Sequence, residues 1–370
     1  MERVVGMSTL RKDPVSSGWV IIAEGRETRP KDLASESARP SKLESCPFCG
    51  GKESETPPEI AAFRKEGTKP DTPGWSVRAI ANKYAALHIE GDLDRRGEGI
   101  YDLMNGIGAH EVIVETPEHD AHMAYYPREK MKEIIWMYIR RYRDLFGDDR
   151  FRYIQVFRNY GAGAGASLEH PHSQLIALPI TPRWVKEELN CALAYYRLKE
   201  RCLFCDIVRQ ETHDRQRVVF ENDSFVTIEP FASKFPFETW LFPKEHNHDF
   251  ALTTEQQVTD LAQALQRTLF AIAECLNDPP LNFIIHSAPR LTEYDLRVTD
   301  ITVEMDYHWH IEIYPRLTRM AGFEWGTGFY INPMLPEKAA EALRRIFDVY
   351  SSQARLRGPR FRKPSNGGSS

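Results

Sequence analysis

The sequence predicts an α+β fold made of two copies of one structural unit. Three observations support this prediction: strand-like and helix-like segments alternate along the chain, a Cys-x-x-Cys motif occurs twice, and a His-x-His motif follows each copy of it. The chain has 370 residues, enough for two ordinary domains or one large one. We expect the units to span residues 1–190 and 191–358, and the polar residues 359–370 to form a disordered tail.

The first half contains one long helix among strands. Apolar residues three and four apart predict an amphipathic helix over residues 129–146. The Pro- and Ser-rich stretches 34–45 and 53–59 are expected to be loops. Strands are predicted, in chain order, at residues 18–24, 75–82, 110–116, 153–159 and 172–179.

The second half repeats this arrangement with different residues. The same helical spacing predicts helices at residues 255–276 and 337–350. Strands are predicted at residues 217–222, 224–231, 238–244, 281–289 and 308–315. Each half therefore supplies a set of strands together with at least one helix that can cover it.

The composition is that of an ordinary globular protein. Hydrophobic residues make up 42% of the chain, charged residues 27%, and the net charge is −5, which argues against broad binding to nucleic acids or membrane surfaces. The first residues, MERVVGMSTLRKDP, lack the apolar run of a signal peptide, and no segment has the length of a membrane span. We therefore expect a cytoplasmic protein.

Each half carries four residues with the chemistry of zinc ligands. A structural zinc site takes four sulfur or nitrogen ligands in a tetrahedron, and two cysteines two apart supply half of it. In both halves the cysteines are followed by a histidine after a strand and Pro, and then by the His-x-His motif. The predicted ligands are Cys46, Cys49, His119 and His170 in the first half, and Cys202, Cys205, His246 and His308 in the second. Four protein ligands leave no open position, so both sites are predicted to be structural.

Other interpretations of these residues exist. A single Cys-x-x-Cys motif is also typical of a redox pair or of two unbridged thiols, but its repetition with matched histidines favours zinc. The metal of the second half is less well defined, because His286, His310 and Glu312 form an alternative metal cluster. Those three residues are more typical of ordinary polar positions in strands.

The segment GAGAGASLEHPHSQ, residues 161–174, predicts a phosphoryl-transfer site. Residues two apart in a strand face the same side, so His172 and Gln174 are expected beside His170. A neutral imidazole is available at pH 7 and can attack phosphorus, and the resulting bond suits transfer rather than hydrolysis. The small residues allow main-chain N–H groups to approach phosphate oxygens, together with the Ser167 hydroxyl and the Gln174 amide.

This segment resembles the galactose-1-phosphate uridylyltransferase family of the histidine-triad superfamily, and the resemblance covers most of the chain. It implies duplicated histidine-triad-like domains, each an antiparallel sheet with packed helices, and His172 as nucleophile. It also implies a homodimer, because residues 321–332 resemble a segment that in the family extends from one subunit to the other. Further residues that the resemblance assigns are Arg26 and Arg29 near the nucleotide phosphates, Asn82 and Asn159 in the nucleotide site, and Glu324 at the sugar.

The resemblance implies an enzyme of galactose metabolism that moves UMP from UDP-glucose to galactose 1-phosphate through a uridylyl-histidine. One alternative is an ADP-glucose phosphorylase or adenylyltransferase, because the second half (PFASKFPFETWLFPKEH) is similar to a plant relative with that activity. The other is a zinc protein that binds nucleotides without catalysis, which the intact HPHSQ motif argues against. The ligand spacings are too long for a DNA-binding zinc finger.

Overall fold

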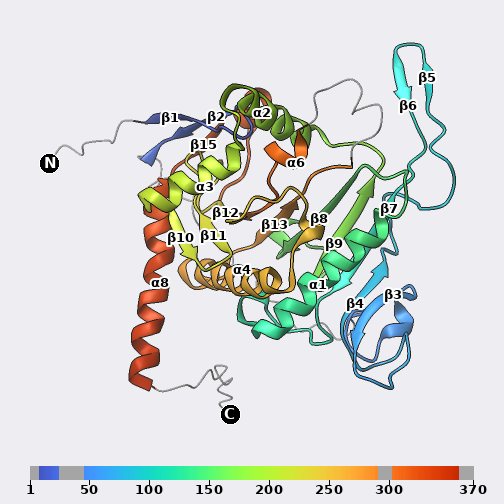
Figure 1. Cartoon of the computed structure of the whole chain (residues 1–370). Helices are drawn as coiled ribbons and strands as arrows, with labels where there is room; N and C mark the ends of the chain where they lie inside the picture. Colours follow the sequence, from blue (N-terminus) through green and yellow to red (C-terminus); the bar gives the residue numbers. More distant parts are fainter. Residues whose placement is uncertain (1–7, 25–45, 291–301, 358–370) are drawn as a thin grey trace.

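The computed structural model describes residues 8–24, 46–290 and 302–357, and its main body is one ten-stranded sheet (Figure 1). Every neighbouring pair of strands in this sheet is antiparallel. In order across the sheet, the strands are β10 (Val218–Glu221), β11 (Phe225–Ile228), β12 (Thr239–Pro243), β14 (His310–Pro315), β13 (Leu281–His286), β8 (Tyr153–Tyr160), β9 (His172–Leu178), β7 (Ala109–Val114), β4 (Trp75–Ala81) and β3 (Glu59–Arg64).

The strand order is the same in the two halves. From the outer edge to the centre it is β3-β4-β7-β9-β8 on one side and β10-β11-β12-β14-β13 on the other. β8 and β13 pair at the centre, where Asn159 lies opposite Asn282. The predicted α+β fold is thus confirmed, and the two expected sheets are continuous. The expected boundary after residue 190 falls inside α2 (Arg183–Lys199) and stays a prediction.

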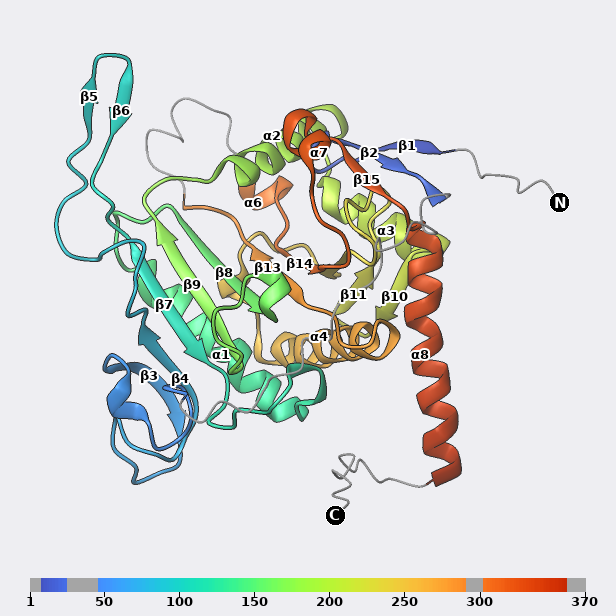
Figure 2. The ribbon, with the colours of Figure 1, turned by 180° about the vertical axis from the view of Figure 1, so that it is seen from behind.

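The two long helices cover one face of the sheet (Figure 2). α1 (Arg128–Leu145) and α4 (Glu255–Cys275) pack against each other and share a core with buried strand residues such as Ile113, Leu175 and Ile285. Fully burying an Ile or Leu side chain contributes about 1.5–3 kcal/mol. α4 begins with a capping box made by Thr254 and Gln257, and α8 (Pro336–Arg357) packs beside it.

The opposite face is covered mainly in the second half. There α3 (Leu203–Asp214) and α2 pack over β11 and β12, with Phe204, Trp240 and Phe242 in a second core. In the first half this same face carries polar side chains of β7, β8 and β9. On this face His110 and Gln174 lie beside a small apolar cluster that includes Val112 and Val114.

Further short elements complete the structure. A three-stranded sheet joins β1 (Thr9–Lys12), β2 (Trp19–Ile22) and β15 (Tyr330–Asn332), and a hairpin of β5 (Arg96–Glu98) and β6 (Tyr101–Leu103) projects from the body (Figure 1). The remaining helices are α6 (Val303–Asp306) and α7 (Gly322–Thr327), with short 3-10 helices at Glu53–Glu55, Met123–Tyr125, Ala162–Ala164 and Phe250–Leu252.

Most predicted elements are found, with shifted ends. All three predicted helices are present, and α8 continues to Arg357. The strand predicted over residues 308–315 begins only at His310, so His308 precedes it. β1, β3, β15, the β5–β6 hairpin and α3 were not predicted. The predicted loop 34–45 and the tail 359–370 lie outside the described residues.

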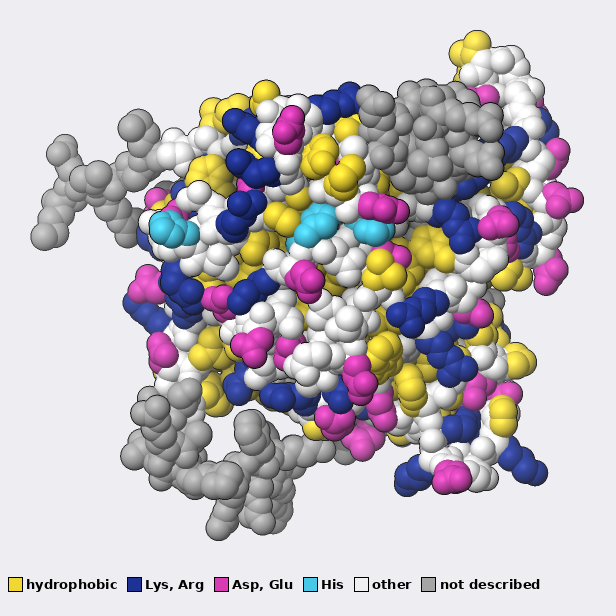
Figure 3. Space-filling view, in the orientation of Figure 1, with side chains coloured by type: hydrophobic (Ala, Val, Ile, Leu, Met, Phe, Trp, Pro, Cys, Tyr) yellow, Lys and Arg dark blue, Asp and Glu magenta, His cyan; other side chains and the backbone are white. Residues whose placement is uncertain are grey.

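Charged side chains of both signs are interspersed over the face shown in Figure 3. This distribution agrees with the small net charge of −5. Among the described helices, none combines the length and the apolar character needed to cross a lipid bilayer.

Candidate functional site

His172, the first residue of β9, has the geometry of an activated nucleophile. Its Nδ1 lies 2.7 Å from the main-chain oxygen of His170. A carbonyl oxygen only accepts hydrogen bonds, so Nδ1 donates and Nε2 keeps its lone pair. Only 6% of His172 is exposed, and burial lowers its pKa below the ordinary 6.5. The imidazole is therefore neutral at pH 7, with Nε2 available to attack an electrophile.

A buried polar network lies behind this nucleophile, on the helix side of the sheet. Arg158 binds Glu115 with two hydrogen bonds, Nε to Oε1 at 2.8 Å and Nη2 to Oε2 at 3.2 Å. The Ser173 hydroxyl donates to Glu115 Oε1 at 2.5 Å, and the Tyr138 hydroxyl lies 2.6 Å from Ser173 Oγ. All four side chains are buried. Because Ser173 follows His172 in β9, this network fixes the strand that carries His172.

Gln174 lies two residues beyond His172 and on the same side of β9. Its Oε1 lies 2.9 Å from Nε2 of His110, which stands on the neighbouring strand β7. Asn82, just after β4, places its Nδ2 3.1 Å from the same nitrogen. The structure thus brings Gln174 and Asn82 together around His110. The sequence analysis missed His110, because a single histidine near the start of a strand has no distinctive pattern.

The glycine- and alanine-rich loop is held by the second half of the chain. Gly161 and Gly165 have φ angles of 79° and 85°, which glycine adopts at little cost. Asn282 of β13 donates from Nδ2 to Asn159 Oδ1 at 2.7 Å and to the main-chain oxygen of Ala164 at 2.8 Å. One side chain therefore positions both the predicted nucleotide residue and the loop. The sequence analysis missed Asn282, since this contact joins residues far apart in the chain.

Other predicted site residues are less closely connected. Ser167 is exposed in the same loop, ahead of His170. Glu324 lies in α7, where its carboxylate accepts the main-chain N–H of Ala321 at 2.9 Å. The structure does not bring Glu324 to His172, because α7 packs on β15. Arg26 and Arg29 lie outside the described residues.

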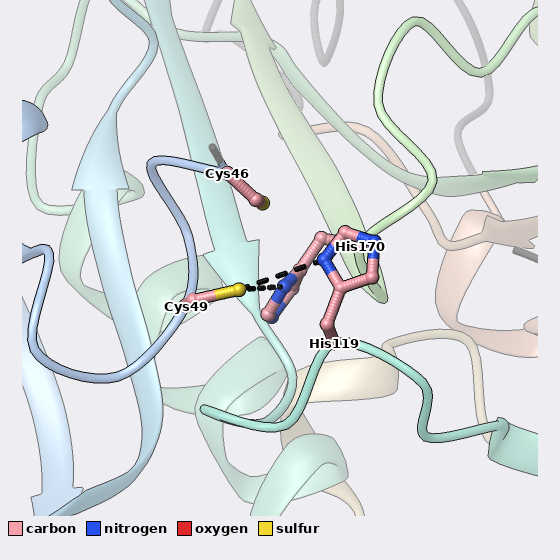
Figure 4. A group of neighbouring side chains, drawn as sticks. All are labelled: Cys46, Cys49, His119 and His170. Carbon is pink, nitrogen blue, oxygen red and sulfur yellow. Dashed lines mark hydrogen bonds between the residues drawn. The ribbon is translucent and has the colours of Figure 1, made fainter. Parts of the chain in front are cut away.

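The four cysteine and histidine residues predicted for the first half meet at one point, with ligand atoms within 4.8 Å of one another (Figure 4). Cys49 Sγ lies 3.5 Å from His119 Nδ1 and 3.6 Å from His170 Nδ1. Tetrahedral zinc with bonds of about 2.0–2.3 Å requires ligand separations of roughly 3.3–3.8 Å. The donor set and spacing therefore fit a metal ion of this kind.

The hydrogen bonds around His170 suit a metal ligand. Its Nε2 donates to the main-chain oxygen of Thr116 at 2.7 Å, which leaves the Nδ1 lone pair facing Cys49. Burial lowers the pKa of His170 to about 4, so the imidazole is neutral. Phe48, between the two cysteines, packs its ring against both His170 and His172, with centroid distances of 6.0 and 5.5 Å. The candidate metal group and His172 therefore share one support.

The second predicted group has the same construction. Cys205 Sγ lies 3.3 Å from His246 Nδ1 and 3.5 Å from His308 Nδ1, and Cys202 completes the group. Nε2 of His308 donates to the main-chain oxygen of Pro243 at 2.9 Å, which leaves the Nδ1 lone pair facing Cys205, as in the first group. Hydrogen bonding from Cys202 and the two imidazoles lowers the pKa of Cys205 to about 3, which favours the thiolate that metals bind.

A third cluster lies buried on the same face of the second half. Glu188 of α2, His286 and His310 have their ligand atoms within 4.8 Å of one another. His286 Nδ1 lies 3.0 Å from Glu188, and its Nε2 lies 3.3 Å from Glu312. Although burial alone lowers the pKa of His286, the two carboxylates raise it to about 10. The alternative cluster proposed from sequence thus comes together, with Glu188 as a member that was not foreseen.

Two family models match the chain. The model described as "Galactose-1-phosphate uridyl transferase, N-terminal domain" matches residues 4–182. A model described as "Domain of unknown function (DUF4921)" matches residues 120–357. The overlap of the two models spans the segment with His172.

Known proteins are similar over nearly the whole chain. An ADP-glucose phosphorylase of Arabidopsis thaliana is 38% identical, covering 91% of this chain and 92% of the relative. A galactose-1-phosphate uridylyltransferase of Thermotoga maritima is 29% identical, covering 91% and 98%. The crystal structure of an Arabidopsis thaliana ADP-glucose phosphorylase with bound ADP-glucose has a TM-score of 0.76 and 36% identity, covering 91% of this chain and 99% of the other. A uridylyltransferase mutant structure has a TM-score of 0.70 and 29% identity, covering 93% and 99%.

Proposed function

The chain belongs to the galactose-1-phosphate uridylyltransferase family of the histidine-triad superfamily, and we propose that it transfers a nucleoside monophosphate through a covalent bond to Nε2 of His172. The hydrogen bond from His172 Nδ1 to the oxygen of His170 carries this proposal. It fixes the tautomer in which Nε2 holds the lone pair. A protein that only bound nucleotides would not need this arrangement.

We propose ADP-glucose as the nucleotide sugar and inorganic phosphate as the acceptor. The 38% identity to an ADP-glucose phosphorylase supports this choice over UDP-glucose and galactose 1-phosphate, which the sequence analysis placed first. Nε2 of His172 attacks the α-phosphorus, the bond to the bridging oxygen breaks, and glucose 1-phosphate leaves. An oxygen of phosphate then attacks the same phosphorus, the P–N bond breaks, and ADP forms.

The second candidate is UMP transfer from UDP-glucose to galactose 1-phosphate. The match of residues 4–182 to the uridyl transferase model and the 29% identity to the Thermotoga maritima enzyme support it. Both candidates share the first step at His172 and differ in the base and the acceptor.

The other site residues would bind and stabilise the substrate. Gln174 donates to a phosphoryl oxygen as charge builds in the transition state. The N–H groups of the glycine-rich loop and Ser167 surround the phosphates, with Arg26 and Arg29 as further positive charges. Asn82 and Asn159 bind the nucleoside. The cluster formed around His110 supports the assignments of Gln174 and Asn82. The other assignments rest on the resemblance to the family.

The two Cys₂His₂ groups would each hold one zinc ion. Bound zinc supplies a rigid cross-link between the cysteine segment and the two histidine segments, and no reaction step passes through it. In the first group, this cross-link fixes His170 and hence the carbonyl that orients His172. The first site is therefore structural, and it supports catalysis indirectly.

We also propose that the protein is a homodimer in which α7 of one copy completes the sugar site of the other. α7 presents Phe323 and Trp325, which are 45% and 74% exposed, on either side of Glu324. Covering two exposed aromatic rings favours association, and it would place Glu324 near a sugar hydroxyl. Light scattering during size-exclusion chromatography should give twice the chain mass, and a monomer at micromolar concentration would contradict the dimer.

The decisive experiment is intact-protein mass spectrometry after brief mixing with ADP-glucose or UDP-glucose and no acceptor. We expect an AMP adduct, which inorganic phosphate then removes, and no adduct in the variant His172→Asn. A UMP adduct removed by galactose 1-phosphate would favour the second candidate. An adduct that persists in His172→Asn, or no adduct with either sugar nucleotide, would refute the covalent mechanism.

A further inference from the structure

Gln174 does not stand free beside the nucleophile, because its amide oxygen lies 2.9 Å from Nε2 of His110. We propose that His110 is a positioning residue that sets the orientation of the Gln174 amide, so that the NH₂ group faces the phosphoryl oxygens. The inference deepens the proposed function and rests on it. It gives a role to a histidine that touches neither the metal groups nor the reacting atoms.

The tautomer of His110 follows from a main-chain contact. Its Nδ1 lies 3.2 Å from the main-chain nitrogen of Ala86. A main-chain amide can only donate a hydrogen bond, so Nδ1 must be the acceptor. In a neutral imidazole the proton then resides on Nε2, which is the nitrogen that faces Gln174. The position of the Ala86 N–H group thus determines which nitrogen of His110 is the donor.

The contact with Asn82 does not change this assignment. Its Nδ2 lies 3.1 Å from His110 Nε2, whereas its Oδ1 accepts the main-chain N–H of Tyr84 at 2.8 Å. Asn82 therefore also presents a donor toward His110, and two donors form no hydrogen bond with each other. In the opposite tautomer, Nε2 of His110 would accept a hydrogen bond from Asn82. However, the proton on Nδ1 would then face the main-chain N–H of Ala86, and this N–H group cannot reorient to avoid it.

The orientation of Gln174 follows from this tautomer. The Nε2–H group of His110 donates to Gln174 Oε1, and the opposite amide orientation would place two donors together. With the oxygen held, the NH₂ group of Gln174 points away from His110, on the side of β9 that carries His172. Without His110, no other described contact holds Gln174 Oε1 in this orientation, so the amide can also turn its oxygen toward a negatively charged phosphoryl group.

A double-mutant cycle tests whether His110 acts through Gln174. The readout is the first-order rate of His172 nucleotidylation at saturating nucleotide sugar, measured by quenched flow. We expect Gln174→Ala to lower this rate about 100-fold and His110→Phe about 10-fold. The double variant should match Gln174→Ala within about twofold. If the two losses multiply in the double variant, or if His110→Phe reacts normally, His110 does not act through Gln174.

Matched controls separate positioning from folding. His213→Phe alters an exposed histidine at the end of α3 and should leave the rate unchanged. His110→Gln restores a donor toward Gln174 and should recover part of the rate lost in His110→Phe. Binding of the nucleotide sugar, measured by calorimetry in a His172→Asn background, should change less than about threefold on His110→Phe, since orientation affects the transition state more than the bound ground state. A loss of binding equal to the loss of rate would contradict positioning.

A direct measurement is independent of activity. In the ¹⁵N-histidine NMR spectrum of the full chain, with His110→Gln used to assign the signal, His110 should be the tautomer protonated at Nε2. A proton on Nδ1 would overturn the inference even if the enzyme is active. Conversely, an Nε2 proton in a protein that forms no nucleotide adduct would refute the proposed function and leave the geometry around Gln174 intact.

Discussion

The Nδ1 atom of His172 lies 2.7 Å from the main-chain oxygen of His170, whose own Nδ1 faces the sulfur of Cys49 at 3.6 Å. Two residues of one short segment thus connect the candidate nucleophile to the first Cys₂His₂ group. A change in the predicted metal ligands of the first half should therefore reach His172, whereas the matching contact of the second group, from His310 Nδ1 to the main-chain oxygen of His308 at 3.1 Å, leads to His310 instead. This difference leads to the first prediction.

Loss of the first metal group should impair transfer more than loss of the second. We expect Cys49→Ser and Cys205→Ser each to lose one zinc per chain, because each removes a ligand of a four-ligand site. Cys49→Ser should also lower the rate of His172 nucleotidylation at least about 10-fold, because losing the metal frees His170, whose main-chain oxygen orients His172. Plasma mass spectrometry for zinc and the adduct rate check this expectation. Equal rate losses in the two variants would show that the link through His170 is unimportant.

The rate of adduct formation should still exceed half of its maximum at pH 6.5. Burial lowers the pKa of His172 below its ordinary value of 6.5, so the neutral, reactive imidazole persists to lower pH than in a free histidine. The rate should reach half of its maximum only below pH 6.5, as the imidazole takes up a proton. Rates measured by rapid quench, with zinc content determined at each pH, test this. A half-maximal rate at or above pH 6.5 would contradict the lowered pKa.

Glu115→Ala should destabilise the protein by about 3–5 kcal/mol, because it leaves the buried guanidinium of Arg158 without its partner. Urea unfolding followed by circular dichroism measures the loss. Glu55→Ala is the matched control, since Glu55 pairs with Lys52 at the surface and its removal should have little effect. If both variants unfold at the same urea concentration, the buried pair does not stabilise β9.

Asn282→Ala should weaken binding of the nucleotide sugar about 10-fold. It removes the donor that holds Asn159 and the Ala164 carbonyl, and each such hydrogen bond is worth about 1 kcal/mol. Calorimetry in the His172→Asn background measures the affinity. Gln266→Ala serves as control, because that amide also donates to a main-chain oxygen, at 2.6 Å, but lies in the helix layer. If Asn282→Ala binds the nucleotide sugar as tightly as the protein with Asn282, both in the His172→Asn background, Asn282 does not position the nucleotide site.

The sequence predicted the metal groups well because each ligand set follows a repeated local pattern. Cys46 and Cys49 are fixed by one turn, and the histidines after the strands recur at matching places in both halves. The structure brings all eight residues into two groups. Their roles as zinc ligands, like the roles of His172 and Gln174 in transfer, stay predictions that the experiments above address.

The order of the strands in the sheet could not be predicted from sequence patterns. Alternation shows which residues share a face of a strand, but it does not show which strands are neighbours. The pairing of β8 with β13 joins the halves into one sheet and places Asn282 beside Asn159. Glu188 of α2 likewise reaches His286, which lies 98 positions further along the chain.

The sequence by itself determined the α+β class, the duplication, the two Cys₂His₂ sets and the His172 segment, because these depend on residue types at short, regular spacings. The tertiary structure alone decided which side chains surround that segment. His110 and Asn282 act on residues 64 and 123 positions away, respectively, across strand pairs that only the folded sheet brings together. The physical reason is that a hydrogen bond depends on distance and direction in space, and neither can be read from separation along the chain.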